Sequence, residues 1–225
     1  NLCFVDTLDN VAALRAYRGQ QDGLFGSVSE ENVERIKRQN SRKISVIIGN
    51  PPYNAWQENF NLRNTNRPYK QVDEHIRSTY AAAGTAQNQI ALYDMFVRFF
   101  RWASDRLDEN GILAFVSNSS FIDSRTFDGF RKLVAEEFNE IWVVNLKGNA
   151  RTSGEQRRRE GGNVFSDKIR VGVAVYFFVK KKGAAGCRIH YEEALQAKMR
   201  FFVESYEKAR KGKAQDGATP IKWDR

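Results

Sequence analysis

The chain has 225 residues, of which 41% are hydrophobic and 12% aromatic, so it can bury a core and is not a disordered or low-complexity segment. It carries 36 Lys and Arg residues against 27 Asp and Glu, a formal net charge of +9. A basic surface attracts polyanions and makes nucleic acid the first partner to consider, although charge alone leaves a basic protein without such a partner equally open.

The cysteine spacing and the short apolar runs argue against a disulfide-rich, a metal-binding and a membrane protein. The two cysteines, Cys3 and Cys187, lie far apart and predict neither a disulfide framework nor a metal site. The longest apolar runs reach about half a membrane span, and no signal-peptide pattern is present. We therefore expect a cytosolic protein with no metal and no membrane partner.

The first part of the chain contains one strongly marked strand. Residues 2–5 are typical of a short strand, and residues 30–42 of a short charged helix. Residues 44–49 form a continuous run of mostly Ile and Val, which is typical of a strand buried on both faces within a parallel sheet. Pro51 and Pro52 end this strand.

Helices and strands alternate in the middle of the chain. Residues 54–88 are polar, and so long an excursion between core elements is usually functional. Beyond it, apolar periodicity predicts helices over 89–107 and 127–138 and strands over 112–116 and 141–144. Asn110 and Gly111 are expected to end the first of these helices.

The last part of the chain completes the sheet. A polar loop over residues 147–168 leads into a long apolar strand over 171–179. Because no helix intervenes, this strand should run antiparallel to the strand before it. A short strand from Ile189 and a helix over 191–210 follow. The order predicts an α/β fold with a Rossmann-like sheet, mostly parallel with an antiparallel final strand.

The tetrapeptide Asn50-Pro51-Pro52-Tyr53 points to chemistry. Ligands of open α/β sheets bind beyond the carboxyl ends of the strands, which is where this tetrapeptide lies. Two prolines fix φ and remove two N–H donors, so the loop is stiff and presents carbonyl oxygens as acceptors. The alternative without function is a strand that ends in a diproline turn with a packed Tyr.

Such a loop suits methylation of the exocyclic amine of a DNA base. The adenine amine is a poor nucleophile because its lone pair is delocalised into the ring. The side-chain oxygen of Asn50 and the carbonyl oxygen of Pro51 can accept hydrogen bonds from both N–H groups and stabilise the charge that develops in the transition state. Tyr53 offers an aromatic face on which a base flipped out of the duplex can stack.

Several stretches in order resemble the motifs of gamma-class N6-adenine DNA methyltransferases. More narrowly, the chain resembles the methyltransferase domain of single-polypeptide type I-like (type ISP) restriction-modification enzymes. Asn50-Pro51-Pro52-Tyr53 matches the catalytic motif fully. The weaker matches are Val5-Asp6-Thr7-Leu8, Leu92-Tyr93-Asp94-Met95-Phe96-Val97, residues 110–119, and Asn163-Val164-Phe165 leading into residues 171–175. The resemblance implies a class I methyltransferase sheet and S-adenosylmethionine as the cofactor.

The resemblance also assigns roles to single residues. It implies that Asp6 contacts the adenine amine of the cofactor, that Asn50 lies beside both cofactor and base, and that Phe165 stacks on the flipped base. A packed loop aromatic is an equally open interpretation of Phe165. The loop beside this site is rich in arginine and could hold DNA phosphates, although a solvated loop is the alternative. Its candidate phosphate contacts are Arg151, Arg157, Arg158 and Arg159.

One feature of the family is missing, because no Gly-x-Gly cofactor loop occurs in the chain. The resemblance therefore makes residues 1–182 the C-terminal part of a methyltransferase catalytic domain. Residues 183–225 become a linker and helix leading toward a target-recognition domain. The implied partners are double-stranded DNA and the other domains of the same enzyme, namely the cofactor-binding half, target recognition, and the helicase and nuclease domains that such enzymes carry.

Three functions stay open on the sequence. The first is methylation of adenine N6 within a restriction-modification enzyme. The second is methylation of cytosine N4, since that amine poses the same chemical problem and only the resemblance favours adenine. The third is an incomplete fragment that binds DNA or acts as a scaffold without activity of its own. Cofactor binding separates the third function from the first two.

Overall fold

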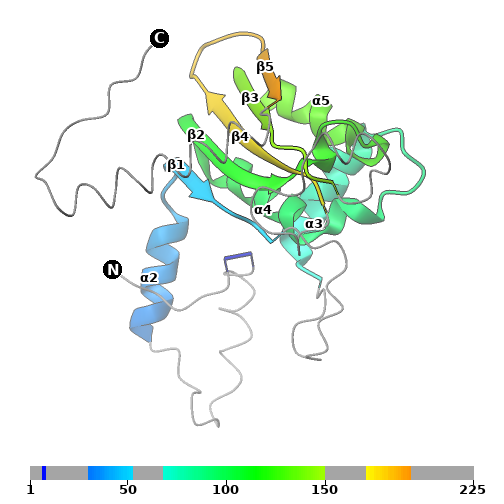
Figure 1. Ribbon diagram of the computed structural model, residues 1–225. Helices are drawn as coiled ribbons and strands as arrows, with labels where there is room; N and C mark the ends of the chain where they lie inside the picture. The colour runs from blue at the N-terminus through cyan, green and yellow to red at the C-terminus, as the bar shows by residue number, and fades with distance from the viewer. Residues whose placement is uncertain (1–6, 9–29, 53–67, 150–170, 194–225) are drawn as a thin grey trace, which may run out of the picture.

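The computed structural model describes residues 7–8, 30–52, 68–149 and 171–193 (Figure 1). The helices and strands of this part are α2 (Glu30–Asn40), β1 (Ile44–Gly49), α3 (Lys70–Ile76), η2 (Arg77–Ala81), η3 (Ile90–Tyr93), α4 (Met95–Arg106), β2 (Leu107–Asn118), η4 (Ser119–Phe121), η5 (Arg125–Phe127), α5 (Asp128–Glu137), β3 (Glu140–Asn145), β4 (Val173–Lys180) and β5 (Arg188–Glu193).

The strands form one sheet in the order β1-β2-β4-β3-β5. Strands β1 and β2 pair in parallel, as do β3 and β5, whereas β4 pairs antiparallel with both β2 and β3. Four of the five strands therefore run in one direction. This confirms the predicted α/β sheet that is mostly parallel, and the predicted antiparallel pairing of β3 with β4. The antiparallel strand lies inside the sheet, and β5 follows it in the chain.

Helices α3, α4 and α5 gather on one side of the sheet (Figure 1), and an aromatic core fills the space between helices and sheet. Phe100 of α4 lies at its centre. Its ring packs edge-on against Phe115 of β2, Phe121 of η4 and Tyr176 of β4, at centroid distances of 5.0, 4.8 and 5.5 Å. Phe121 in turn stacks on Phe130 of α5 at 4.0 Å. These aromatic contacts tie α4 and α5 to the middle of the sheet.

The prediction that the strand over 44–49 is buried on both faces is wrong for this part of the chain. Ile47 is 8% exposed and faces the helices, but Val46 and Ile48 are 55% and 79% exposed. Apolar side chains continue along that second face through Ile112, Phe177 and Trp142. A strand rich in Ile and Val is expected to have helices packed on both faces of its sheet. The helices packed into the described core lie on one face only.

The end of the first predicted helix also differs from the prediction. A short turn, η3, precedes α4, and α4 ends at Arg106 instead of continuing to Asn110 and Gly111. Both residues lie inside β2, and Gly111 pairs with Lys180 of β4. A Cβ atom at Gly111 would lie 2.7 Å from Leu107 Cγ, so this glycine serves close packing and does not end a helix.

Other expectations are met in outline or lie beyond the described residues. The long polar excursion contains α3 and η2 in its described part, and β2 is longer than predicted because it pairs along both of its edges. The predicted strand over 2–5 falls outside the described residues. The predicted helix over 191–210 is wrong at its start, because residues 191–193 belong to β5, which pairs with β3; its remainder falls outside the described residues. None of the described helices has the length and apolar character needed to cross a membrane.

Candidate active site

The predicted catalytic loop lies at the carboxyl end of β1. Strand β1 ends at Gly49, and of the residues that follow, Asn50 is exposed, Pro51 is buried and Pro52 is exposed. Pro51 is thus held by the protein while Asn50 faces outward. Because β1, β2 and β3 run in one direction, the ends of all three strands meet at this edge of the sheet. Tyr53 falls outside the described residues.

A close contact fixes the position from which the loop departs. The register pairs Gly49 with Phe115 of β2, and a Cβ atom at Gly49 would lie 2.8 Å from Phe115 Cε1. The phenyl ring therefore fills the space where a side chain at position 49 would go. Phe115 is 3% exposed and packs against Phe100, so the residue before Asn50 rests on the core. Sequence reasoning missed this pair; the glycine directly before Asn-Pro-Pro is the signal that could have revealed it.

The turn after β2 forms the next part of the edge. Asn118 Oδ1 accepts a hydrogen bond from the Ser120 backbone N–H at 2.9 Å, and the Asn118 carbonyl accepts one from Tyr176 Oη at 2.9 Å. The Ser119 N–H donates to the Gly172 carbonyl at 2.8 Å. The polar turn that resembles a family motif is thus fixed by its own hydrogen bonds. The buried Ser117 hydroxyl has no hydrogen-bond partner among the described residues.

The end of β3 is turned sharply at the same edge. Lys147 and Gly148 have φ angles of 57° and 81°, in the left-handed region. Asn145 Oδ1 stabilises the turn by accepting from the Lys147 backbone N–H at 2.9 Å, and Asn145 Nδ2 donates to Tyr191 Oη at 3.0 Å. Strand β3 therefore ends at the edge that carries Asn50.

An ion pair that the sequence did not reveal holds the start of α3, where the chain rejoins the core after the polar segment that follows the catalytic loop. Asp73 of α3 accepts hydrogen bonds from Arg98 Nε and Nη2 at 2.7 and 3.0 Å, and from the Tyr69 backbone N–H at 2.9 Å. The guanidinium of Arg98 also lies 5.1 Å from the centroid of the Tyr69 ring. Arg98 is 4% exposed. Since α4 runs back toward the start of β2, its N-terminal half, which holds Arg98, lies toward the carboxyl edge of the sheet.

The remaining predicted site residues lie outside the described residues. They are Asp6, Tyr53, Phe165, Arg151, Arg157, Arg158 and Arg159, and their roles stay predictions. For the cofactor, the described part offers one of the two predicted contacts: Asn50, which is exposed on the outermost strand of the described sheet. An amide at this place fits the border of a cofactor site. A phosphate- or carboxylate-binding glycine loop is not among the described residues.

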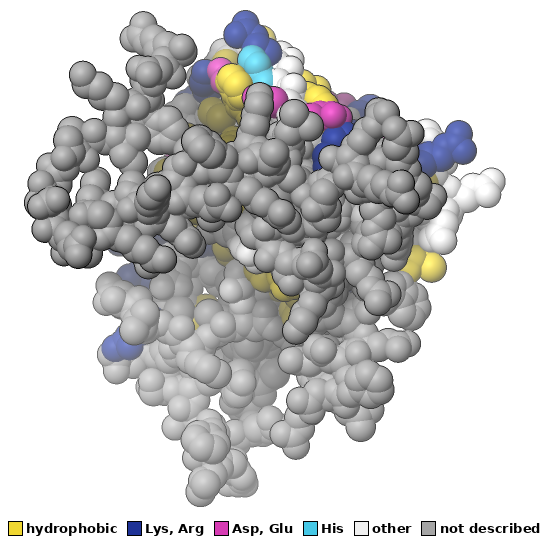
Figure 2. Space-filling view, viewed as in Figure 1, with side chains coloured by type: hydrophobic (Ala, Val, Ile, Leu, Met, Phe, Trp, Pro, Cys, Tyr) yellow, Lys and Arg dark blue, Asp and Glu magenta, His cyan; other side chains and the backbone are white. Residues whose placement is uncertain are grey.

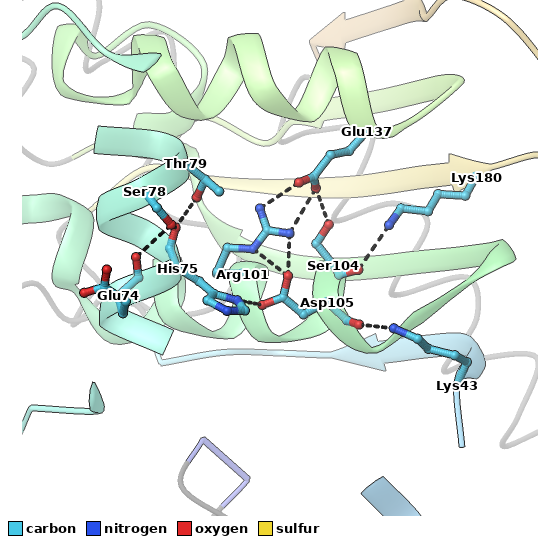
Figure 3. Close-up of polar contacts among 10 residues, drawn as sticks. All are labelled: Lys43, Glu74, His75, Ser78, Thr79, Arg101, Ser104, Asp105, Glu137 and Lys180. Atoms are coloured by element: carbon cyan, nitrogen blue, oxygen red, sulfur yellow. Dashed lines mark hydrogen bonds and ion pairs between the residues drawn. The ribbon is translucent and has the colours of Figure 1, made fainter. Parts of the chain in front are cut away.

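A second cluster of charged side chains lies at the opposite, amino edge of the sheet (Figure 3). Arg101 of α4 donates to Asp105 Oδ1 from Nε and Nη2 at 3.0 and 2.7 Å, and to Glu137 Oε1 from Nη1 at 2.8 Å. The Ser104 hydroxyl also donates to Glu137, and His75 Nδ1 lies 2.8 Å from Asp105 Oδ2. Arg101 is 4% exposed, and its donors are used within the cluster. The cluster joins α3, α4 and α5.

Two neighbours of this cluster have altered proton affinity. Lys180 Nζ donates to the Ser104 carbonyl at 3.1 Å, and partial burial lowers the pKa of this lysine. Burial raises the pKa of Tyr80, although the guanidinium of Arg101 lies 5.1 Å from its ring and opposes the shift. Both shifts follow from placing an ionisable group inside the protein, and neither requires a catalytic role. Among the described residues, no group of His, Cys, Asp and Glu side chains could hold a metal ion.

Comparison with protein families gives one match. The family described as Eco57I restriction-modification methylase matches residues 17–151, which include the strand β1 and the Asn-Pro-Pro-Tyr loop. No curated protein matches the chain.

Solved structures give stronger likenesses. The DrdV–DNA complex is 58% identical with a TM-score of 0.72, over 87% of this chain. A nuclease-deletion mutant of the type ISP restriction-modification enzyme LlaGI, in complex with a DNA substrate mimic, is 35% identical with a TM-score of 0.72 over 86% of this chain. The ATP-dependent type ISP enzyme LlaBIII bound to DNA is 36% identical with a TM-score of 0.71 over 85% of this chain. The chain spans 18%, 18% and 12% of the lengths of these three proteins.

Proposed function

Because the chain belongs to the Eco57I restriction-modification methylase family, we propose that it forms part of a DNA methyltransferase domain that methylates adenine at N6. Membership of a methylase family implies S-adenosylmethionine as the methyl donor. The proposed substrate is double-stranded DNA, which agrees with the net charge of +9 and with the DNA complexes of the three similar structures.

The placement of Asn50 and Pro51 is the observation that carries this proposal. An exposed Asn50 next to a buried Pro51, at the carboxyl end of β1, puts a side-chain oxygen and a rigid backbone at the edge where such sheets bind ligands. In the proposed reaction these two residues accept hydrogen bonds from the amine of a flipped base. They stabilise the charge that appears on the amine as the methyl group is transferred. Tyr53 and Phe165 are the proposed stacking partners of the base.

We further propose that residues 1–182 need another part of the same enzyme to complete the catalytic domain, and that residues 183–225 lead toward a target-recognition domain. Two observations support the first half of this proposal. The outer edge of β1 has no strand partner in the described sheet, and the apolar face with Val46 and Ile48 is exposed. The similar structures contain more than enough additional polypeptide to cover both.

Radiolabelled methyl transfer to duplex DNA, followed by base analysis, tests the proposal on the native, full-length protein. We expect N6-methyladenine. Asn50→Ala should slow the transfer by about 100- to 1,000-fold, the usual cost of losing one group that stabilises transition-state charge. The thermal midpoint should fall by at most a few degrees, because Asn50 is exposed and exposed substitutions cost about 0.5 kcal/mol or less.

Asn110→Ala is the matched control. Asn110 is an exposed asparagine at the opposite end of the β1–β2 pair, where its Oδ1 accepts from the Lys182 N–H at 3.0 Å. Its replacement should leave the transfer rate within about twofold, the range of ordinary surface changes. A product of N4-methylcytosine, or full activity in Asn50→Ala, would contradict the proposal. Absence of cofactor binding by the full-length protein would favour a scaffold instead.

A further inference from the structure

An apolar groove runs beside α5 on the face of the sheet that carries the helices. Its floor consists of inward-facing side chains of β3, β4 and β5, and its wall consists of α5 with the turn η4. Ile141 and Val143 form the centre of the floor, and Val134 of α5 forms part of the wall. The groove therefore occupies the next helix position along the sheet after α5.

The far side of this groove is uncovered. Ile141 of β3 is 6% exposed, but Ile189 of β5, its direct partner in the register, is 62% exposed. Tyr191, two residues further along β5, is 50% exposed. Hydrophobic side chains lie among basic and acidic ones at the end of the molecule where β5 lies (Figure 2). An exposed apolar strip of this kind at the edge of a packed sheet usually marks a surface to which another segment or molecule binds.

The residues that follow β5 have the pattern of such a segment. Leu195, Met199, Phe202, Val203 and Tyr206 recur at the spacing of one helical face. Of the seven positions between them, three are charged, two are polar and two are apolar. A helix of twelve residues is about 18 Å long, and a strand of six residues spans about 20 Å. The two lengths match, so such a helix could cover the whole of β5.

We propose that residues 195–206, which lie outside the described residues, form a helix whose apolar face occupies this groove beside α5. Chain connectivity favours this occupant over a second copy. Residue 195 is only two residues beyond Glu193, the end of a strand that itself lines the groove. A segment on so short a tether meets its site at an effective concentration of about millimolar or more. Docking of this helix then fixes the direction in which the chain leaves the sheet.

Hydrogen exchange of the whole chain tests the docking from the side of the groove. Residues 195–206 should be protected, and Ile189→Asp should reduce this protection by about tenfold or more, because a charge in the groove opposes docking. Arg188→Asp is the matched control, since it places the same charge one residue away on the opposite face of β5. It should leave the protection unchanged.

Two adjacent phenylalanines test the docking from the side of the segment. Phe202 lies on the apolar helical face and Phe201 does not. Phe202→Asp should remove the protection of residues 195–206 and increase exchange in β5, whereas Phe201→Asp should do neither. Equal effects of the two substitutions, or an unprotected segment in the unaltered chain, would overturn the proposal. Protection that grows with protein concentration would show a second copy in the groove and would also overturn it.

Discussion

The two edges of the sheet differ in the surroundings of their polar side chains. At the amino edge, Arg101, Asp105 and Glu137 satisfy one another. At the carboxyl edge, Asn50 is exposed beside two prolines that have no N–H to donate. The charged groups at the amino edge bond to one another and join helices, whereas an exposed amide at the carboxyl edge is accessible to a ligand. The difference shows why the larger charged cluster is the structural one.

Helix α4 connects the two edges through two buried arginines three residues apart. Arg101→Met should lower the free energy of unfolding by about 3 kcal/mol, because Glu137 and Asp105 lose their partner while remaining partly buried. Arg98→Met should cost about as much, since Asp73 is left in the same condition. Urea unfolding measures both losses.

Methyl transfer by the full-length protein separates the two arginines. Arg98→Met should also slow the transfer at a temperature where the protein is folded, because the Arg98–Asp73 pair anchors the chain that returns from the catalytic loop. Arg101→Met should not. Equal effects on the transfer rate would show that the two edges are not functionally distinct.

Two glycines on the β1–β2 pair offer a smaller and sharper test. Gly49→Ala and Gly111→Ala each place a Cβ atom within 2.8 Å or less of a buried side chain, Phe115 in the first case and Leu107 in the second. Each should cost about 1–3 kcal/mol of stability, as overpacking does. Only Gly49→Ala should slow methyl transfer by more than its loss of folded protein explains, because it displaces the residue before Asn50. A rate loss of the same size in Gly111→Ala would refute this.

Substitutions of two buried tyrosines should change the free energy of unfolding least. Tyr176 Oη donates to the Asn118 carbonyl, so Tyr176→Phe should cost about 1 kcal/mol. The Tyr80 hydroxyl is buried without a hydrogen-bond partner in the described part of the chain, so Tyr80→Phe should be neutral or slightly stabilising near pH 7. Chemical denaturation of the two variants measures the difference, and a larger loss in Tyr80→Phe would reverse the expected order.

The same phenols determine the alkaline limit of stability. Burial raises the pKa of Tyr80 and Tyr176 in the folded state, whereas the pKa of an unfolded tyrosine is about 10. A raised folded pKa means that stability is full below about pH 10 and declines above it, because only the unfolded chain then releases these protons. Tyr80→Phe should make this decline less steep in urea titrations between about pH 8 and 11. An unchanged slope would argue against burial of this phenol.

Chain order made much of the sheet predictable. A loop without a helix between the strands over 141–144 and 171–179 indicated the antiparallel pair. The apolar run before Asn-Pro-Pro indicated a strand, and the proposed site lies at the carboxyl end of that strand. Contacts between distant segments were not predictable in the same way. Arg98 and Asp73 are 25 residues apart, and nothing in the local pattern around either residue reveals its partner. The Asn110-Gly111 pair has the composition of a helix end. The close contact with Leu107 that requires glycine at position 111 cannot be recognised from the sequence.

The outer edge of β1 has a consequence for work with this chain in isolation. Strand β1 is outermost in the described sheet, and its side chains from Val46 to Ile48 are all apolar. An exposed, apolar edge strand is a template on which strands of other molecules can pair, which leads to aggregation. The chain alone should therefore lose solubility as its concentration rises. A charged residue at position 48, on the uncovered face, would counter this without disturbing the aromatic core.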